Sequence, residues 1–190
     1  MKKRLGLIGA CAVGMVLGAL SQEYPPSFQA SFVPEGAMYP REQRIEGMTL
    51  SIWGENPQSA FALGFVNGST GQSSGLSLGL LNYAESYTGI HWAFANLTEK
   101  DFSGWQGGPA LGFVGSAVNY VGGEMQGFQS GVVNLAGRLG GVQFGLVNYT
   151  QYADRSLQIG LINVIAQNGY WFENWPDEVA PGMILVNWRY

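Results

Sequence analysis

The sequence predicts an all-β protein, and more specifically an up-and-down β-barrel of the outer-membrane type with eight to ten strands. Three observations lead to this fold class. A strand-like phrase of about 15 residues recurs along much of the chain. Within each copy, the residue types alternate with a period of two, which is the period of a β-strand. Charged residues make up only 12% of the 190 residues, about half the usual share, so both faces of each strand are largely apolar.

Residues 1–21 have the pattern of a secretory signal peptide. A basic start at residues 2–4 precedes the apolar stretch 5–20, and small residues at its end suit cleavage before Gln22. An uncleaved membrane anchor is one alternative interpretation. Another is lipidation of Cys11, because the residues before it resemble a bacterial lipobox.

Residues 22–46 are expected to form an extended arm because they contain four prolines, and residues 47–190 form a repeat β-domain. Cleavage of the signal peptide removes the only cysteine, so neither a disulfide framework nor a cysteine-based metal site is expected. The mature chain then has six Lys and Arg against 13 Asp and Glu. This acidic balance predicts no nucleic-acid partner, and no motif predicts a cofactor.

Seven copies of the phrase follow one another in the repeat domain, and most of them end in asparagine. The last positions of these copies lie 14, 15 or 19 residues apart, which is too regular to be chance. Residues 182–187 form a degraded last copy, and residues 48–54 form a weak first one. The seven copies are residues 61–67, 76–82, 90–96, 109–115, 128–134, 142–148 and 157–163.

The sixth copy illustrates the alternation. Phe144, Leu146 and Asn148 fall on one face of the predicted strand, whereas Gln143 and Gly145 fall on the other. The short polar or glycine-containing segments between copies are expected to be turns. These segments are residues 85–89, 99–104, 136–140 and 151–156.

A parallel β-solenoid is the alternative fold, in which each copy is one coil and the recurrent asparagines stack into a ladder. The barrel is favoured because both strand faces are apolar, and because Tyr83, Tyr149 and Trp188 lie where an aromatic girdle is expected. Residues 184–190 also alternate and end on Tyr190, like the terminal strand that outer-membrane barrels present to their assembly machinery. The odd count of nine copies and the similarly short connections at both ends argue against the barrel.

The phrase Gly-Leu-Val-Asn with an upstream Leu-Gln-Ile or Val-Gln-Phe is clearest at residues 141–164. It resembles a family of bacterial surface-repeat proteins that carry tandem copies behind a signal peptide. The resemblance covers about residues 48–190 and implies an exported protein of the outer membrane or cell surface of a Gram-negative bacterium. It implies no activity and no catalytic residue. The expected partners are outer-membrane lipid, the barrel-assembly machinery and an unidentified surface ligand.

Two places in the chain are candidates for a functional site. His91 is the only histidine, and its register places it on the strand face opposite Trp92 and Phe94, which is expected to face outward. An outward position does not suit a buried catalytic base. The second place is an aromatic segment that departs from the repeat. An interfacial belt or a plug over the barrel mouth is the favoured interpretation of it, and a partner-binding loop is the functional hypothesis. Its aromatic residues are Tyr170, Trp171, Phe172 and Trp175.

The predicted function is a non-enzymatic structural or interaction role at the outer membrane or cell surface. The alternative is a β-solenoid surface lipoprotein or adhesin that displays a repetitive binding face to a partner. A third class, a membrane-embedded lipid-modifying enzyme, depends on His91 and is the least favoured.

Overall fold

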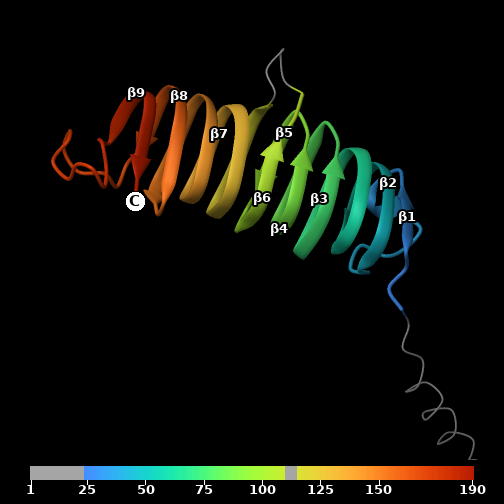
Figure 1. The fold of residues 1–190 in the computed structure, drawn as a ribbon. Helices are drawn as coiled ribbons and strands as arrows, with labels where there is room; N and C mark the ends of the chain where they lie inside the picture. Colours follow the sequence, from blue (N-terminus) through green and yellow to red (C-terminus); the bar gives the residue numbers. More distant parts are fainter. Residues whose placement is uncertain (1–23, 110–114) are drawn as a thin grey trace, which may run out of the picture.

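A computed structural model of the protein describes residues 24–109 and 115–190 and shows a stack of β-coils along one gently curved axis (Figure 1). Strands make up nearly all of the regular structure, so the all-β prediction is confirmed. The elements are β1 (Phe28–Ser31), η1 (Pro34–Gly36, a 3-10 turn), β2 (Ile45–Asn56), β3 (Gln58–Leu78), β4 (Leu81–Trp92), β5 (Ala95–Thr98), β6 (Phe102–Gly107), β7 (Ser116–Ala153), β8 (Ser156–Ile165) and β9 (Gly182–Arg189).

The strands form a parallel β-solenoid of about eight turns, so the predicted barrel is wrong and the alternative fold is the correct one. The strand pairs from β1–β2 to β7–β8 are parallel, whereas an up-and-down barrel pairs its neighbours antiparallel. Val142 pairs with Leu157, and Asn148 pairs with Asn163, so each residue lies beside its equivalent in the next coil. The repeated unit is therefore one coil and not one strand.

The segments between the copies bend the chain around the coil instead of reversing it. Residues 85–89 and 136–140, which were predicted to be turns, lie inside β4 and β7. At one such bend, Gly89 has a φ of 135°, and a Cβ there would lie 2.0 Å from the carbonyl oxygen of Gly75 in the preceding coil. Only glycine accommodates both conditions. Glycines with positive φ recur at this position of the coil as Gly47, Gly75, Gly89, Gly104, Gly127 and Gly141.

The alternation of inward and outward side chains is interrupted just before the asparagine of each coil. Gln143 is buried and Phe144 and Leu146 are exposed, as a period of two requires, but Asn148 is buried as well. The prediction that Asn148 shares a face with Phe144 and Leu146 is therefore wrong. The coil turns a corner around Val147, and the asparagine side chain points into the interior.

The inward asparagines form a hydrogen-bonded ladder through the solenoid. Asn134 Nδ2 donates to Asn148 Oδ1 at 2.8 Å, and Asn148 Nδ2 donates to Asn163 Oδ1 at 2.7 Å. Asn148 Nδ2 also donates to the carbonyl oxygen of Ile159 at 3.0 Å, so the same buried amide satisfies a main-chain group. The ladder runs through Asn67, Asn82, Asn96, Asn119, Asn134, Asn148 and Asn163.

The structure departs from the prediction at two of the copies. The ladder position after Asn96 belongs to Asn119 and not to Gly115, and residues 110–114 of the predicted fourth copy lie outside the described ranges. The last copy is not a further parallel coil, because β9 pairs antiparallel with β8. Its Asn187 is nevertheless buried and lies opposite Gln158.

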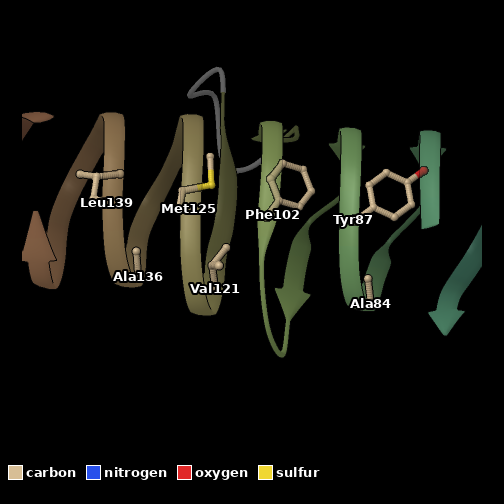
Figure 2. Packing of buried hydrophobic residues seen from close by; sticks show 7 residues of the cluster. All are labelled: Ala84, Tyr87, Phe102, Val121, Met125, Ala136 and Leu139. Atoms are coloured by element: carbon tan, nitrogen blue, oxygen red, sulfur yellow. The ribbon is translucent and has the colours of Figure 1, made fainter. Parts of the chain in front are cut away.

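The rest of the interior combines a column of amides with an apolar cluster. Gln143 Nε2 donates to Gln129 Oε1 at 2.8 Å, and the same bond links Gln158 to Gln143. Figure 2 shows the apolar cluster, in which large side chains from successive coils lie in a row above smaller ones. Its members are Ala84, Tyr87, Phe102, Val121, Met125, Ala136 and Leu139.

The amino-terminal end of the solenoid is formed within the segment predicted to be an extended arm. There β1 pairs in parallel with β2, with Phe28 opposite Met48. Arg41 makes an ion pair with Glu55 of β2 and so ties the connecting segment to the sheet. The predicted signal peptide and Cys11 lie outside the described residues.

Candidate binding surface

Outward side chains of successive coils form three apolar columns, which we together call the apolar face. The register stacks each residue on its equivalent, as it does for Leu76 and Ile90 and for Phe144 and Ile159. In the middle coils, Gly107 and Ser130 interrupt the second column. The first column consists of Phe61, Leu76, Ile90, Trp105, Phe128, Val142, Leu157 and Trp188. The second column consists of Leu50, Leu63, Leu78, Trp92, Phe144 and Ile159. The third column consists of Ile52, Phe65, Leu80, Phe94, Ala117, Val132, Leu146 and Leu161.

Many side chains of the apolar face are open to solvent in the described chain. Phe65, Leu80 and Leu161 are 60%, 58% and 59% exposed. None of the three columns contains a charged residue. In the coils from β3 to β8, the charges instead lie on the bend segments that follow the ladder asparagines, at Glu85, Glu99, Lys100, Asp101, Glu124, Arg138, Asp154 and Arg155.

The size of the apolar face follows from sheet geometry. Eight coils spaced about 4.8 Å apart give a length of ~35 Å, and three columns of side chains give a width of ~20 Å, hence an area on the order of 700 Å². The largest apolar patch of a typical monomer covers roughly 300–600 Å² and is often functional. The apolar face is therefore a candidate interaction surface.

Two grooves run along the apolar face between its second and third columns. One has a volume of about 540 Å³ and is lined by residues such as Leu63, Phe65 and Trp92. The other has a volume of about 210 Å³ and is lined by residues such as Phe144 and Leu161. The larger groove is widely open to solvent, so it is a shallow feature of the apolar face and not an enclosed ligand site.

A glycine lies between the second and third columns in several coils and leaves space for side chains of the interior. A Cβ on Gly145 would point inward and lie 2.6 Å from Asn134 Nδ2 and 2.0 Å from the carbonyl oxygen of Gly131. The same holds for Gly160 against Asn148 and Gly145. Glycine at this position therefore leaves room for the asparagine ladder, and it leaves bare backbone between the two apolar columns outside.

The aromatic segment after β8 continues the first column of the apolar face. Trp188 of β9 pairs with Leu157 in that column, and its ring centroid lies 5.2 Å from that of Trp175. The ring centroid of Phe172 lies 6.1 Å from that of Trp175, and the ring centroid of Trp171 lies 6.4 Å from that of Phe172. The structure thus brings three of the four predicted loop residues into one chain of rings at the carboxyl-terminal end of the stack. We call residues 170–176 the aromatic loop.

The aromatic loop is exposed but anchored. Tyr170 and Trp171 are 83% and 63% exposed. Behind them, the buried Glu178 accepts hydrogen bonds from Asn174 Nδ2 at 2.7 Å and from the amide of Gly169 at 2.8 Å, and it forms an ion pair with Arg189. The prediction of a plug over a barrel mouth is wrong because the fold is a solenoid. The loop lies instead at the end of the stack (Figure 1).

His91 lies inside the solenoid, so the prediction that it faces outward is wrong. Its side chain is only 1% exposed and takes the column position of Ser77 and Gln106. Its ring lies 4.1 Å from that of Tyr87 and 5.1 Å from that of Phe102, measured between centroids. Burial lowers the pKa of His91 to about 3, because the enclosed imidazole cannot gain the solvation that its charged form needs. The error arose because both strand faces are apolar and neither one identifies the interior.

A small ionic cluster lies at the amino-terminal end of the described chain. The Tyr83 hydroxyl donates a hydrogen bond to the Glu55 carboxylate, which also forms an ion pair with Arg41. The same Tyr83 hydroxyl accepts a hydrogen bond from Trp53 Nε1 at 3.0 Å. Burial raises the pKa of Tyr83 to about 12, and the bond to Glu55 adds to this rise. The cluster joins the segment before β2 to the first coils.

Within residues 24–109 and 115–190, no three His, Cys, Asp or Glu side chains are grouped so that they could hold a metal ion. None of the helical structure in these ranges is long and apolar enough to cross a membrane. Comparisons of the chain with protein-family models, with curated proteins and with solved structures found no significant match.

Proposed function

We propose that the protein is a non-enzymatic surface protein of the bacterial cell envelope and that it binds a partner through the apolar face. This role corresponds to a β-solenoid adhesin or surface lipoprotein with a repetitive binding face. The observation that carries the proposal is the apolar face itself, an uncharged and exposed area that repeats over eight coils. Exposed apolar patches of this size mark interaction surfaces. The basic and apolar residues 1–21 and the resemblance of the repeats support export.

The chemistry of the apolar face also suits binding better than catalysis. Its columns contain no carboxylate, histidine or lysine that could transfer a proton. His91 is enclosed between Tyr87 and Phe102, so a substrate has no contact with its imidazole. We therefore assign His91 a packing role within this proposal.

A thiol-labelling experiment in cells tests both parts of the proposal. The full-length chain is expressed in a Gram-negative host as Leu146→Cys or as Gln151→Cys, two exposed positions of one coil of which only Leu146 belongs to the apolar face. Wild type, whose only cysteine is Cys11, gives the background labelling. With a membrane-impermeant maleimide, we expect Gln151→Cys to react in intact cells. We expect Leu146→Cys to react several-fold more slowly there than in the purified folded protein, because the partner covers it.

Two results would contradict the proposal in different ways. If neither thiol reacts until the cells are lysed, the location at the surface is wrong. If Leu146→Cys reacts in intact cells as fast as in the purified protein, the apolar face is uncovered and the binding role is wrong.

A further inference from the structure

We infer that the partner of the apolar face is a lipid surface, and that the aromatic loop anchors the solenoid at the boundary between lipid and water. This inference rests on the proposed binding role. It adds the chemical class of the partner and a second element of the site, and it places the long axis of the solenoid parallel to the lipid surface.

The polar groups of the apolar face favour lipid over a protein partner. A protein interface of this size is expected to contain about ten direct hydrogen bonds. The apolar face has few polar side-chain atoms, and the structure pairs several of them internally. Trp105 Nε1 donates to Ser130 Oγ at 3.1 Å, and Trp188 Nε1 donates to the carbonyl oxygen of Pro176 at 2.9 Å. Hydrocarbon needs no hydrogen bonds and is the partner that matches such a surface.

The grooves favour acyl chains over a second copy of this chain. Both grooves lie along the same two columns, one lined by Leu63 and Phe65 and the other by Phe144 and Leu161. Two such hollowed surfaces would leave voids if they met face to face, and voids forfeit the packing contacts that stabilise an interface. Acyl chains are flexible and fill an elongated apolar groove.

The aromatic loop has the composition of a membrane-interface anchor. Tryptophan and tyrosine combine an apolar ring with a polar group, and they concentrate where hydrocarbon meets headgroups. Trp171 and Trp175 are 63% and 56% exposed, and the stacked rings connect them to Trp188 of the apolar face. The flank of the face beyond the asparagine ladder also presents rings with hydroxyls, as at Tyr120 and Tyr149.

The charge distribution defines the kind of lipid. The apolar face is uncharged, and the acidic residues Glu173 and Asp177 lie within and next to the aromatic loop. An acidic protein gains nothing from anionic headgroups, so binding to zwitterionic lipid is expected to be at least as strong. Because the contact is apolar, binding is expected to change little with salt.

Flotation with phosphatidylcholine vesicles tests the inference. Processed protein from expressing cells is compared as wild type, as the double variant Leu146→Glu and Leu161→Glu, and as the matched control Gln126→Glu and Gln151→Glu. Both variants add two negative charges at exposed positions, but only the first pair lies on the apolar face. We expect wild type and control to float equally at 50 and 500 mM NaCl, and the partition coefficient of the first variant to fall at least tenfold, because buried carboxylates are costly. Thermal unfolding verifies that all three proteins are folded.

Each other outcome overturns the lipid assignment. If the folded wild type does not float, or if all three proteins float equally, the apolar face does not bind lipid. Equal flotation would point to the amino-terminal segment or to lipidated Cys11 as the anchor. Light scattering of the same proteins identifies a further case, in which the wild type is a dimer that the Leu146→Glu and Leu161→Glu variant converts to a monomer. That result would leave the proposed binding role intact and replace lipid with a second copy, whereas the labelling experiment in cells tests the binding role itself.

Discussion

Replacement of His91 by glutamine is expected to make the protein more resistant to acid. His91 is completely buried, and its pKa in the folded protein is lowered to about 3, against 6.5 for the unfolded chain. As the pH falls below 6.5, the unfolded chain takes up a proton at this position while the folded protein does not. Folding is therefore favoured above pH 6.5, and this contribution is lost progressively as the pH falls towards 3. Glutamine does not titrate and removes the effect.

The magnitude follows from the pKa difference. One pKa unit corresponds to about 1.4 kcal/mol, and the unfolded histidine is already half protonated at pH 6.5, so the wild type should lose about 2 kcal/mol between pH 6.5 and pH 4.5 through His91 alone, and about 4 kcal/mol by pH 3. At pH 7 we expect the variant to be within about 1 kcal/mol of wild type. Glutamine suits the column, where Gln106 and Gln129 already bond to each other at 2.9 Å, but the ring contact with Tyr87 is lost.

Urea unfolding of both proteins between pH 4 and pH 8 measures the effect. Carboxylates that titrate over this range contribute almost equally to both proteins, so the difference between their free energies of unfolding isolates His91. That difference should shift by about 2 kcal/mol in favour of the variant between pH 6.5 and pH 4.5. Two parallel curves would refute the reasoning, because they would mean that His91 takes up its proton as readily in the folded protein as in the unfolded chain.

Three further substitutions test the ladder, the bend and the aromatic loop. Asn134→Ala is expected to cost about 2–4 kcal/mol in urea unfolding, because Asn134 bonds to both neighbouring asparagines and to the carbonyl oxygen of Phe144; a loss below 0.5 kcal/mol would mean that the ladder adds little stability. Gly89→Ala is expected to cost about 3 kcal/mol or more because of its positive φ and the nearby carbonyl oxygen of Gly75, and an unchanged unfolding midpoint would contradict the tight bend. Trp171→Ala is expected to leave stability within about 0.5 kcal/mol while it lowers the partition into phosphatidylcholine vesicles several-fold, and undiminished flotation would exclude the loop as an anchor.

Local features of the sequence predicted much of the fold. The period of two identified strands, and the spacing of the asparagines identified a unit of 14 or 15 residues, which is the length of one coil in most of the stack. The aromatic residues after β8 were predicted as a distinct segment because they interrupt the repeat, and the structure keeps them together. These features depend on neighbouring residues and so are visible without a fold.

The candidate binding surface was less accessible to prediction. Phe144 and Leu146 were placed on one face, which the structure confirms, but that face was not assigned to solvent. Asn119 was missed because the phrase before it lacks the usual glycine and leucine. The connection between the aromatic loop and the face depends on β9, whose antiparallel course places Trp188 beside Leu157.

The sequence by itself determined that the chain is a repetitive β-protein with little charge and a glycine in most coils. The tertiary structure decided the direction in which strands pair, and with it which side of each strand is inside. A period of two and a regular spacing of copies occur both in strands joined by hairpins and in the coils of a solenoid. Both patterns depend only on residues close in sequence, so neither pattern shows in which direction neighbouring strands pair. Burial depends on residues one coil away: Gln143 and Asn148 became interior because their amides bond to Gln158 and Asn163. Phe144 and Leu146 alternate with Gln143 and Gly145 along the strand, so they lie outside as part of the apolar face.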